Sequence, residues 1–154
     1  MPYLIPGIGH LNLVKISYNY LNENNIPRED SSWIALHFSP GLALEVSLKA
    51  CLSQLGFSTD QLKTGKFGHR LDALTNAVEE SLDGNPQAFN KFLILRPVLG
   101  ELIDCIGADY LNMNYRYLEG DEVFSIRPGD SFLNAISLVE SVCNITEFLQ
   151  SQKT

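Results

Sequence analysis

The stretch Gly41-Leu-Ala-Leu-Glu45-Val-Ser-Leu-Lys49-Ala-Cys-Leu-Ser-Gln-Leu-Gly56 decides the fold, because it is apolar on nearly every side of a helix. A helix of that kind is buried in the core of a domain. Glu45 and Lys49 are its charged residues, and they lie one helical turn apart. Burying them costs several kcal/mol unless they are paired. The sequence therefore predicts a core helix that contains a paired acid and base.

Signals on either side of this stretch predict where the helix begins and ends. Gly56 is suited to end it in the left-handed conformation. Ser39-Pro40 has the pattern of an N-cap followed by proline at the first helical position. A helical run capped by Asp30 or Ser31 precedes Pro40. It is either a separate helix or the first half of one helix that is kinked at the proline.

The rest of the chain repeats the helical period, and no segment alternates in the manner of a strand in a sheet. We expect an all-α fold, an up-down helical bundle of about five helices, with its longest core helix between Ser39 and Leu55. We expect a helix that begins at Asn85-Pro86, with Asn85 as N-cap and Pro86 at the first helical position, and we expect Pro97 to kink or restart it. Val123 to Ile126 is expected to form a brief extended piece. The other expected elements are helices at 7–24, 69–82 and 131–150 and a loop at 57–68.

Size and composition limit the class of protein. With 154 residues, of which 45% are hydrophobic, the chain is expected to form a single domain, 1–154, with one core. Its formal charge is −7 and its pI about 4.8. This acidity argues against a surface built to hold nucleic-acid phosphates, and we expect no DNA partner. Charge alone does not exclude RNA.

Cysteine usage and hydropathy indicate the compartment. Cys51, Cys105 and Cys143 are odd in number and form no Cys-x-x-Cys pair, so we expect all three to pack in the core of a protein in a reducing compartment. The longest apolar run, Phe92–Leu99, is far shorter than the roughly 20 residues of a membrane span. The first residues carry no secretory signal, so we expect a cytoplasmic protein.

Metal and cofactor chemistry is not expected. The histidines His10, His37 and His69 lie on different segments without metal-ligand spacing. The glycine-containing loops around Gly7 and Gly65 lack the strand and spacing of a phosphate-binding loop. The acidic run Glu119, Asp121 and Glu122 is most simply a solvated loop. The same holds for the basic run Lys63, Lys66, His69 and Arg70, although with Phe67 between its charges it has the chemistry to hold a phosphate or a stacked base.

The pair Glu45 and Lys49 is the candidate site. With the acid four residues before the base, the order favours an intrahelical ion pair. The apolar flanks indicate that the pair faces a neighbouring helix or a pocket, with His69 and Arg116 as possible further members. Two readings stay open from the residues alone: a structural polar network, and a binding or catalytic site.

Two motifs resemble the HEPN superfamily, small helical bundles of prokaryotic defence and toxin–antitoxin modules. Leu-Ala-Leu-Glu45-Val-Ser-Leu-Lys49-Ala-Cys-Leu is similar to the Glu-x-x-x-Lys-Ala-x-Leu helix of many members, and Gly68-His69-Arg70-Leu71 to their Gly-His-Asp-Leu. Arg116-Tyr117 is similar to a later Arg-Tyr pair. The resemblance implies a bundle of about five helices that often dimerises. It also implies activities from metal-independent RNA cleavage to nucleotide or partner binding.

The sequence departs from the nuclease members at their catalytic motif. Those members have an arginine followed four to six residues later by a histidine, and no arginine of this chain has a histidine at that distance. Arg70 also stands where members usually have aspartate.

Two hypotheses follow. In the first, the chain is a non-catalytic HEPN-like module that binds a partner protein, nucleotide or RNA through Glu45, Lys49, His69, Arg116 and Tyr117, within a prokaryotic defence or toxin–antitoxin system. In the second, it is a metal-independent ribonuclease with His69 as base and Lys49 or Arg116 as the stabilising cation. A closed ion-pair network favours the first, and an open cleft around the same side chains favours the second.

We also expect a homodimer. The helical region Phe89 to Ile106 offers more apolar surface than a small bundle core can cover. Uncovered apolar surface of this kind marks an interface.

Overall fold

The computed structural model describes residues 3–111 and 129–153, and within them it contains helices and no strand. The prediction of an all-α helical bundle is confirmed, whereas the extended piece expected at Val123 to Ile126 lies outside the described residues. The helices are α1 Leu4–Glu23, α2 Ser31–Gln54, α3 Thr59–Leu62, α4 Leu71–Ser81, α5 Pro86–Leu111 and α6 Gly129–Ser151.

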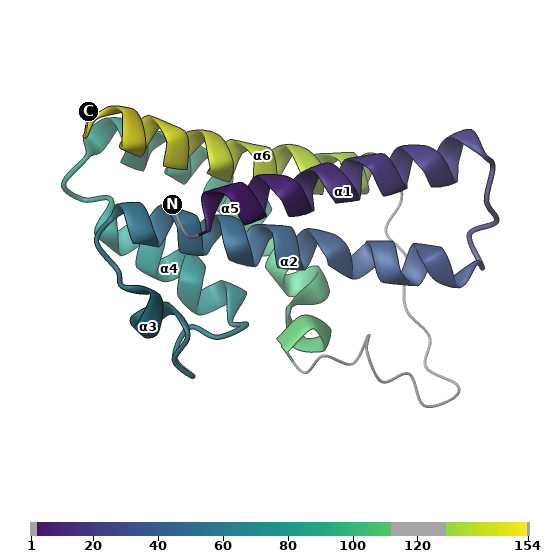
Figure 1. The fold of residues 1–154 in the computed structure, drawn as a ribbon, viewed down its shortest axis with the longest axis horizontal. Coiled ribbons are helices and arrows are strands. Elements are labelled where there is room, and N and C mark those ends of the chain that lie inside the picture. The colour runs from purple at the N-terminus through teal and green to yellow at the C-terminus, as the bar shows by residue number, and fades with distance from the viewer. Residues whose placement is uncertain (1–2, 112–128, 154) are drawn as a thin grey trace.

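Helix α2 is the centre of the bundle. It packs against α1 and α6 as well as against α4 and α5, and α1 and α4 lie on opposite sides of it (Figure 1). Buried residues therefore occur all around it, including Leu44, Leu48 and Leu52 at 0% exposure. The prediction of a core helix over this stretch is confirmed.

Of the two starts left open by the sequence, α2 has the earlier one, so Ser31 to Gln54 is a single helix and no separate helix begins at Ser39. Asp30 is the N-cap, and its carboxylate accepts a hydrogen bond from the backbone N–H of Ser32 at 2.8 Å. The helix then continues through Pro40 without a break. Ser39 is not a cap, because its hydroxyl donates to the carbonyl of Ala35 at 2.9 Å inside the helix. The helical turns before and after the proline are buried in the same core, and this packing keeps the two halves in a single helix.

Helix α5 is the longest helix of the described part, with 26 residues against 24 in α2, so the expectation that the longest helix lies between Ser39 and Leu55 was wrong. Its start was predicted correctly: Asn85 accepts from the backbone N–H of Ala88 at 3.1 Å, and Pro86 follows. The helix passes through Pro97 and continues to Leu111. Figure 1 shows its second half bending away from the first, as a proline inside a helix causes.

The segment between α2 and α4 is more ordered than the expected loop. Gly56 has φ of +103°, the left-handed conformation predicted for it. Ser58 and Gln61 then form a reciprocal capping box that starts the short helix α3. Helix α4 begins at Leu71 with Arg70 as its N-cap, so His69 precedes the helix and does not open it.

The three cysteines are not equivalent. Cys51 and Cys143 are buried, as expected, and burial raises the pKa of the Cys51 thiol to about 12. Cys105 is exposed, which corrects the expectation that it packs in the core. On α5 the inward face is occupied by Leu102 and Ile106, and Cys105 falls between them on the outward face.

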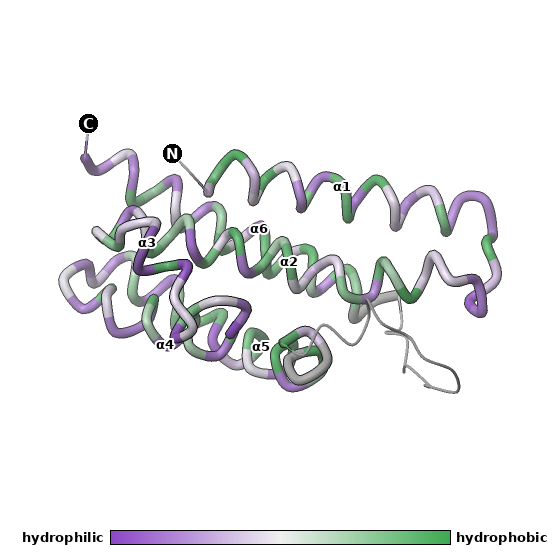
Figure 2. The backbone as a smooth tube through the Cα atoms, turned by 60° about the horizontal axis from the view of Figure 1, so that its bottom comes forward, coloured by the Kyte–Doolittle hydropathy of each residue, from purple (hydrophilic) through white to green (hydrophobic). Residues whose placement is uncertain are grey.

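One helix of the described part, Phe132–Ser151, is long and apolar enough to cross a membrane by length and composition. In the bundle, 56% of its most apolar window is buried against other helices. A core helix of a soluble protein has these properties, so this helix is weak evidence for a membrane span. Figure 2 shows that apolar segments recur in every long helix, as expected when all of them contribute to one core.

Helices α2 and α5 approach each other closely at Gly41. A Cβ atom at this position would lie 2.8 Å from Cδ2 of Tyr110 and 3.0 Å from Cδ1 of Ile106. Both neighbouring side chains are almost fully buried and cannot move aside into solvent. Glycine is therefore required at position 41 for α5 to lie against α2.

We predict that Gly41→Ala lowers the free energy of unfolding by about 1–3 kcal/mol, because the added methyl group overpacks the contact. Gly100→Ala in α5 is the matched control. Its Cβ would meet only Nη1 of Arg96, at 3.9 Å, so the better helix propensity of alanine should raise stability by about 0.5–1 kcal/mol. Urea unfolding followed by circular dichroism measures both changes, and equal effects of the two substitutions would contradict the packing argument.

Candidate functional site

A buried carboxylate, that of Glu45, organises the candidate site. The residue is only 4% exposed, and it lies on the central helix α2. Its Oε1 atom accepts from Lys49 Nζ at 2.7 Å. Its Oε2 atom accepts from the Tyr110 hydroxyl at 2.6 Å and is 2.9 Å from Nδ1 of His69. Three side chains from three parts of the chain therefore meet on one carboxylate.

Lys49 is positioned by the helix itself. It follows Glu45 by four residues, so both side chains project from the same face of α2. Lys49 is 7% exposed, and its ammonium group is an ion-pair partner of Glu45 inside the protein. A lysine held in this way does not reach a ligand on the surface.

Tyr110 enters the site from the second half of α5. Its ring packs against Gly41, one helical turn before Glu45, so the hydroxyl arrives at the carboxylate. Sequence reasoning did not include Tyr110 in the site. The one available signal was Gly41 itself, which leaves room for a ring on the face of α2 that carries Glu45.

His69 forms the outer edge of the cluster, with 41% of its side chain exposed. A carboxylate can only accept hydrogen bonds, so Nδ1 of His69 carries the proton in this contact. In the neutral ring, Nε2 is then left as an acceptor. The ring of Tyr110 contacts His69 edge to face, with the ring centroids 6.2 Å apart, which fixes the orientation of the imidazole.

The electrostatics of the cluster favour an ionised Glu45. Burial opposes ionisation, but the hydrogen bonds from Lys49, Tyr110 and His69, together with the charge of Lys49, lower the pKa of Glu45 below its ordinary value of 4.5. The carboxylate therefore carries its charge at neutral pH, compensated by the ammonium group beside it.

The structure brings together three of the five predicted site residues: Glu45, Lys49 and His69. Arg116 and Tyr117, the other two, lie outside the described residues. Lys63 and Lys66 of the basic run do not contribute to the cluster. Lys66 instead lies over the ring of Phe67, with Nζ 5.1 Å from the ring centroid.

A cleft of about 470 Å³ opens beside His69. Among the residues that the structure describes, its polar lining besides His69 consists of Arg70 and Asp72 from the start of α4 and Asp104 from α5. Arg70 is paired with Asp72 at 3.0 Å. Leu71, Ile103 and Leu111 supply the apolar walls of the cleft.

The described residues therefore offer the cleft an imidazole acceptor, two carboxylates and one engaged guanidinium group. Among residues 3–111 and 129–153, no group of three or more His, Cys, Asp or Glu side chains is arranged to hold a metal ion. Comparison of the chain with protein-family models, with curated proteins and with solved structures finds no match.

We predict strong coupling between Glu45 and Lys49 in a double-mutant cycle. Glu45→Leu or Lys49→Met alone should lower the free energy of unfolding by about 3–5 kcal/mol, because each leaves a buried charge without its partner. The double variant should lose about 2–3 kcal/mol less than the sum of the two single losses. Urea unfolding of the four proteins measures the coupling.

The exposed pair Arg70 and Asp72 is the control for this cycle. Its side chains are 47% and 54% exposed, so the cycle of Arg70→Gln and Asp72→Asn should give a coupling of at most about 1 kcal/mol. Additive losses at Glu45 and Lys49 would show that the buried pair is not a unit.

Proposed function

We propose that this protein is a non-catalytic, HEPN-like helical module that binds a partner protein at the cleft beside His69. The observation that carries the proposal is the closure of the Glu45 cluster. Both carboxylate oxygens are engaged, and Lys49 and Tyr110 are buried with them. The cluster thus acts as a structural support that holds His69 at the edge of the cleft.

The charges of the cleft favour a protein partner over a nucleotide or RNA. Within the described part of the lining, Asp72 and Asp104 place two carboxylates against one guanidinium group that is already paired with Asp72. A phosphate group would be repelled by this arrangement. A lysine or arginine of a partner protein would be attracted by Asp104 and would find an acceptor in His69 Nε2.

One observation favours the second hypothesis, a metal-independent ribonuclease. His69 is oriented by a carboxylate through Nδ1, the arrangement that prepares an imidazole to act as a general base. RNA cleavage also needs a cation beside the phosphate. Lys49 is buried on the far side of the same carboxylate, and Arg116, the other proposed cation, is not among the described residues. The binding function therefore has the stronger support.

The resemblance of the Glu45–Lys49 and Gly68–Leu71 motifs to HEPN proteins supports the biological setting in this proposal. We propose a cytoplasmic component of a prokaryotic defence or toxin–antitoxin system. The helical bundle of the described residues agrees with that class of fold.

We predict that the purified protein does not cleave RNA. Structured and single-stranded RNA incubated with it in the presence of a chelator should remain intact, both with the wild type and with His69→Ala. Cleavage by the wild type that disappears in His69→Ala would overturn the proposal and establish the ribonuclease.

A titration followed by NMR tests the binding class. A short peptide of lysine and arginine residues should shift the backbone amide signals of Leu71, Ile103 and Asp104, and Asp104→Asn should weaken this binding several-fold. A single-stranded RNA oligonucleotide should leave the same signals unchanged. Shifts caused by the RNA and not by the peptide would contradict a basic protein partner.

A further inference from the structure

Helix α1 carries apolar residues on two opposite faces. One face packs on α2 and α6 and includes Leu11 and Val14, which are nearly fully buried. The opposite face carries a stripe of large apolar side chains at helical spacing, which are 60–76% exposed: Ile5, Leu13, Ile16 and Tyr20. The stripe is about 23 Å long at ~1.5 Å per residue. We call it the α1 stripe.

The α1 stripe is free of charge although the chain carries a formal charge of −7. From Leu4 to Asn22, the one Asp, Glu, Lys or Arg residue is Lys15. Its ammonium group is paired with Glu140 of α6 at 2.9 Å, to the side of the stripe. Two negatively charged copies of the chain therefore meet with the least repulsion on this face.

We propose that the α1 stripe is the contact surface between two copies of this chain, with the two α1 helices antiparallel. A twofold axis next to Leu13 places Ile5 opposite Tyr20 and Gly9 opposite Ile16. Ile16 of each copy then faces the open space at Gly9 of the other, and Ile5 lies beside the Tyr20 ring, so apolar surface of one copy meets apolar surface of the other. This inference does not depend on the proposed function of the His69 cleft.

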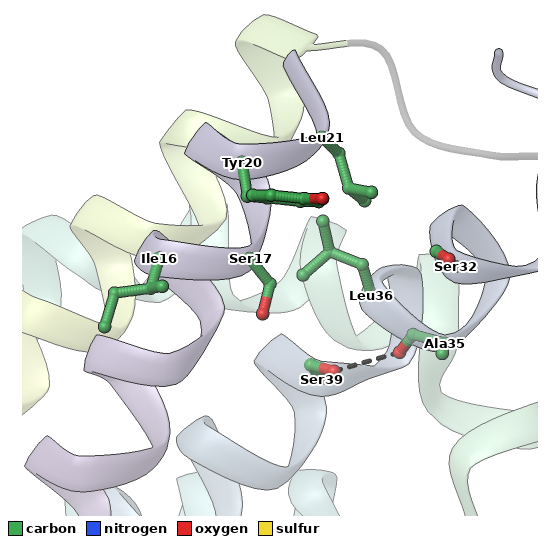
Figure 3. A pocket seen from close by; sticks show the side chains of 8 residues that line it. All are labelled: Ile16, Ser17, Tyr20, Leu21, Ser32, Ala35, Leu36 and Ser39. Atoms are coloured by element: carbon green, nitrogen blue, oxygen red, sulfur yellow. Dashed lines mark hydrogen bonds between the residues drawn. The ribbon is translucent and has the colours of Figure 1, made fainter. Parts of the chain in front are cut away.

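A groove beside the stripe accepts the protruding residue of the other copy. It lies between α1 and α2, has a volume of about 470 Å³, and is lined by uncharged side chains. Figure 3 shows Ser17 of α1 directed toward the space between the helices, with Tyr20 and Leu36 beside it, whereas the Ser39 hydroxyl of α2 points to the Ala35 carbonyl of its own helix. In the antiparallel arrangement, the Ile5 side chain of the second copy is next to Tyr20 and enters this groove.

Gly9 is a second, independent indication that α1 contacts another copy of the chain. It is exposed in the second turn of α1, and a Cβ atom there would meet nothing within 4 Å, so packing within the chain does not require glycine. Glycine is also a poor helix former. A second helix crossing the stripe gives the residue a role, because the missing side chain leaves space for Ile16 of the other copy.

The exposed apolar face of α5 is less suited to form the contact between two copies. Leu93, Ile94 and Val98 of α5, in the region first expected to form the dimer, are 40–77% exposed. Charged residues surround them: Lys91 lies over the ring of Phe148, and Arg96 is paired with Glu79. We therefore assign the contact between copies to α1.

The mass in solution tests this assignment. Sedimentation equilibrium of the wild type at micromolar concentration should give twice the chain mass of 17.2 kDa. Ile16→Glu, and independently Ile5→Glu, should raise the dissociation constant of the dimer at least about a hundredfold, because each buries an unpaired charge in the contact. The helical circular dichroism of both variants should be unchanged. Ile94→Glu on α5 is the control and should remain dimeric. A monomeric wild type, or a dimer lost in Ile94→Glu and kept in Ile16→Glu, would overturn the proposal.

Cysteine cross-linking tests the antiparallel register. In a Cys105→Ser background, which removes the exposed native thiol, Gly9→Cys and Ile16→Cys should form a disulfide-linked dimer when the two proteins are mixed and oxidised. Each variant alone should stay unlinked, because identical positions lie about 10 Å apart along the helix axis. Efficient linkage of Gly9→Cys to itself would show a parallel arrangement and refute the proposed one.

Discussion

The ionised carboxylate of Glu45 inside the bundle is the constraint on which the site depends. A buried charge is tolerated only where donors and an opposite charge replace the lost water, and here α2, α5 and the segment before α4 each supply one donor. The carboxylate thereby links the central helix to two neighbours. It also determines the orientation of His69, the member of the cluster that reaches the surface.

The fold separates two surfaces with different chemistry. The cleft beside His69 lies at α4 and α5, and its polar lining is rich in carboxylates. The α1 stripe is apolar and uncharged, and α1 and α4 lie on opposite sides of α2 (Figures 1 and 2). A dimer formed through α1 therefore leaves the cleft of each copy open for a partner.

The sequence predicted the features that depend on local chemistry. Asp30 and Asn85 cap helices, Gly56 is left-handed, and the helix around Glu45 and Lys49 is buried with its acid and base paired. Features that depend on contacts between distant segments were missed. The sequence left open whether Pro40 separates two helices or lies inside one, because the local penalty of the proline was visible and the core packing on both of its sides was not.

Tyr110 was missed for the same reason. It follows Glu45 by 65 residues, and nothing near it in the sequence indicates a buried partner. The exposed position of Cys105 depended likewise on which face of α5 meets α2.

The pKa of Glu45 tests the account most directly, and it can be measured from the side-chain carbonyl carbon signal in a pH titration followed by NMR. Hydrogen bonds that outweigh burial should place it below 4.5. The folded pKa is then below the unfolded one, so the stabilisation is present above about pH 4.5 and is lost as the pH falls through the folded value. A midpoint at or above 4.5 would show that burial dominates, and it would contradict the proposed role of the carboxylate.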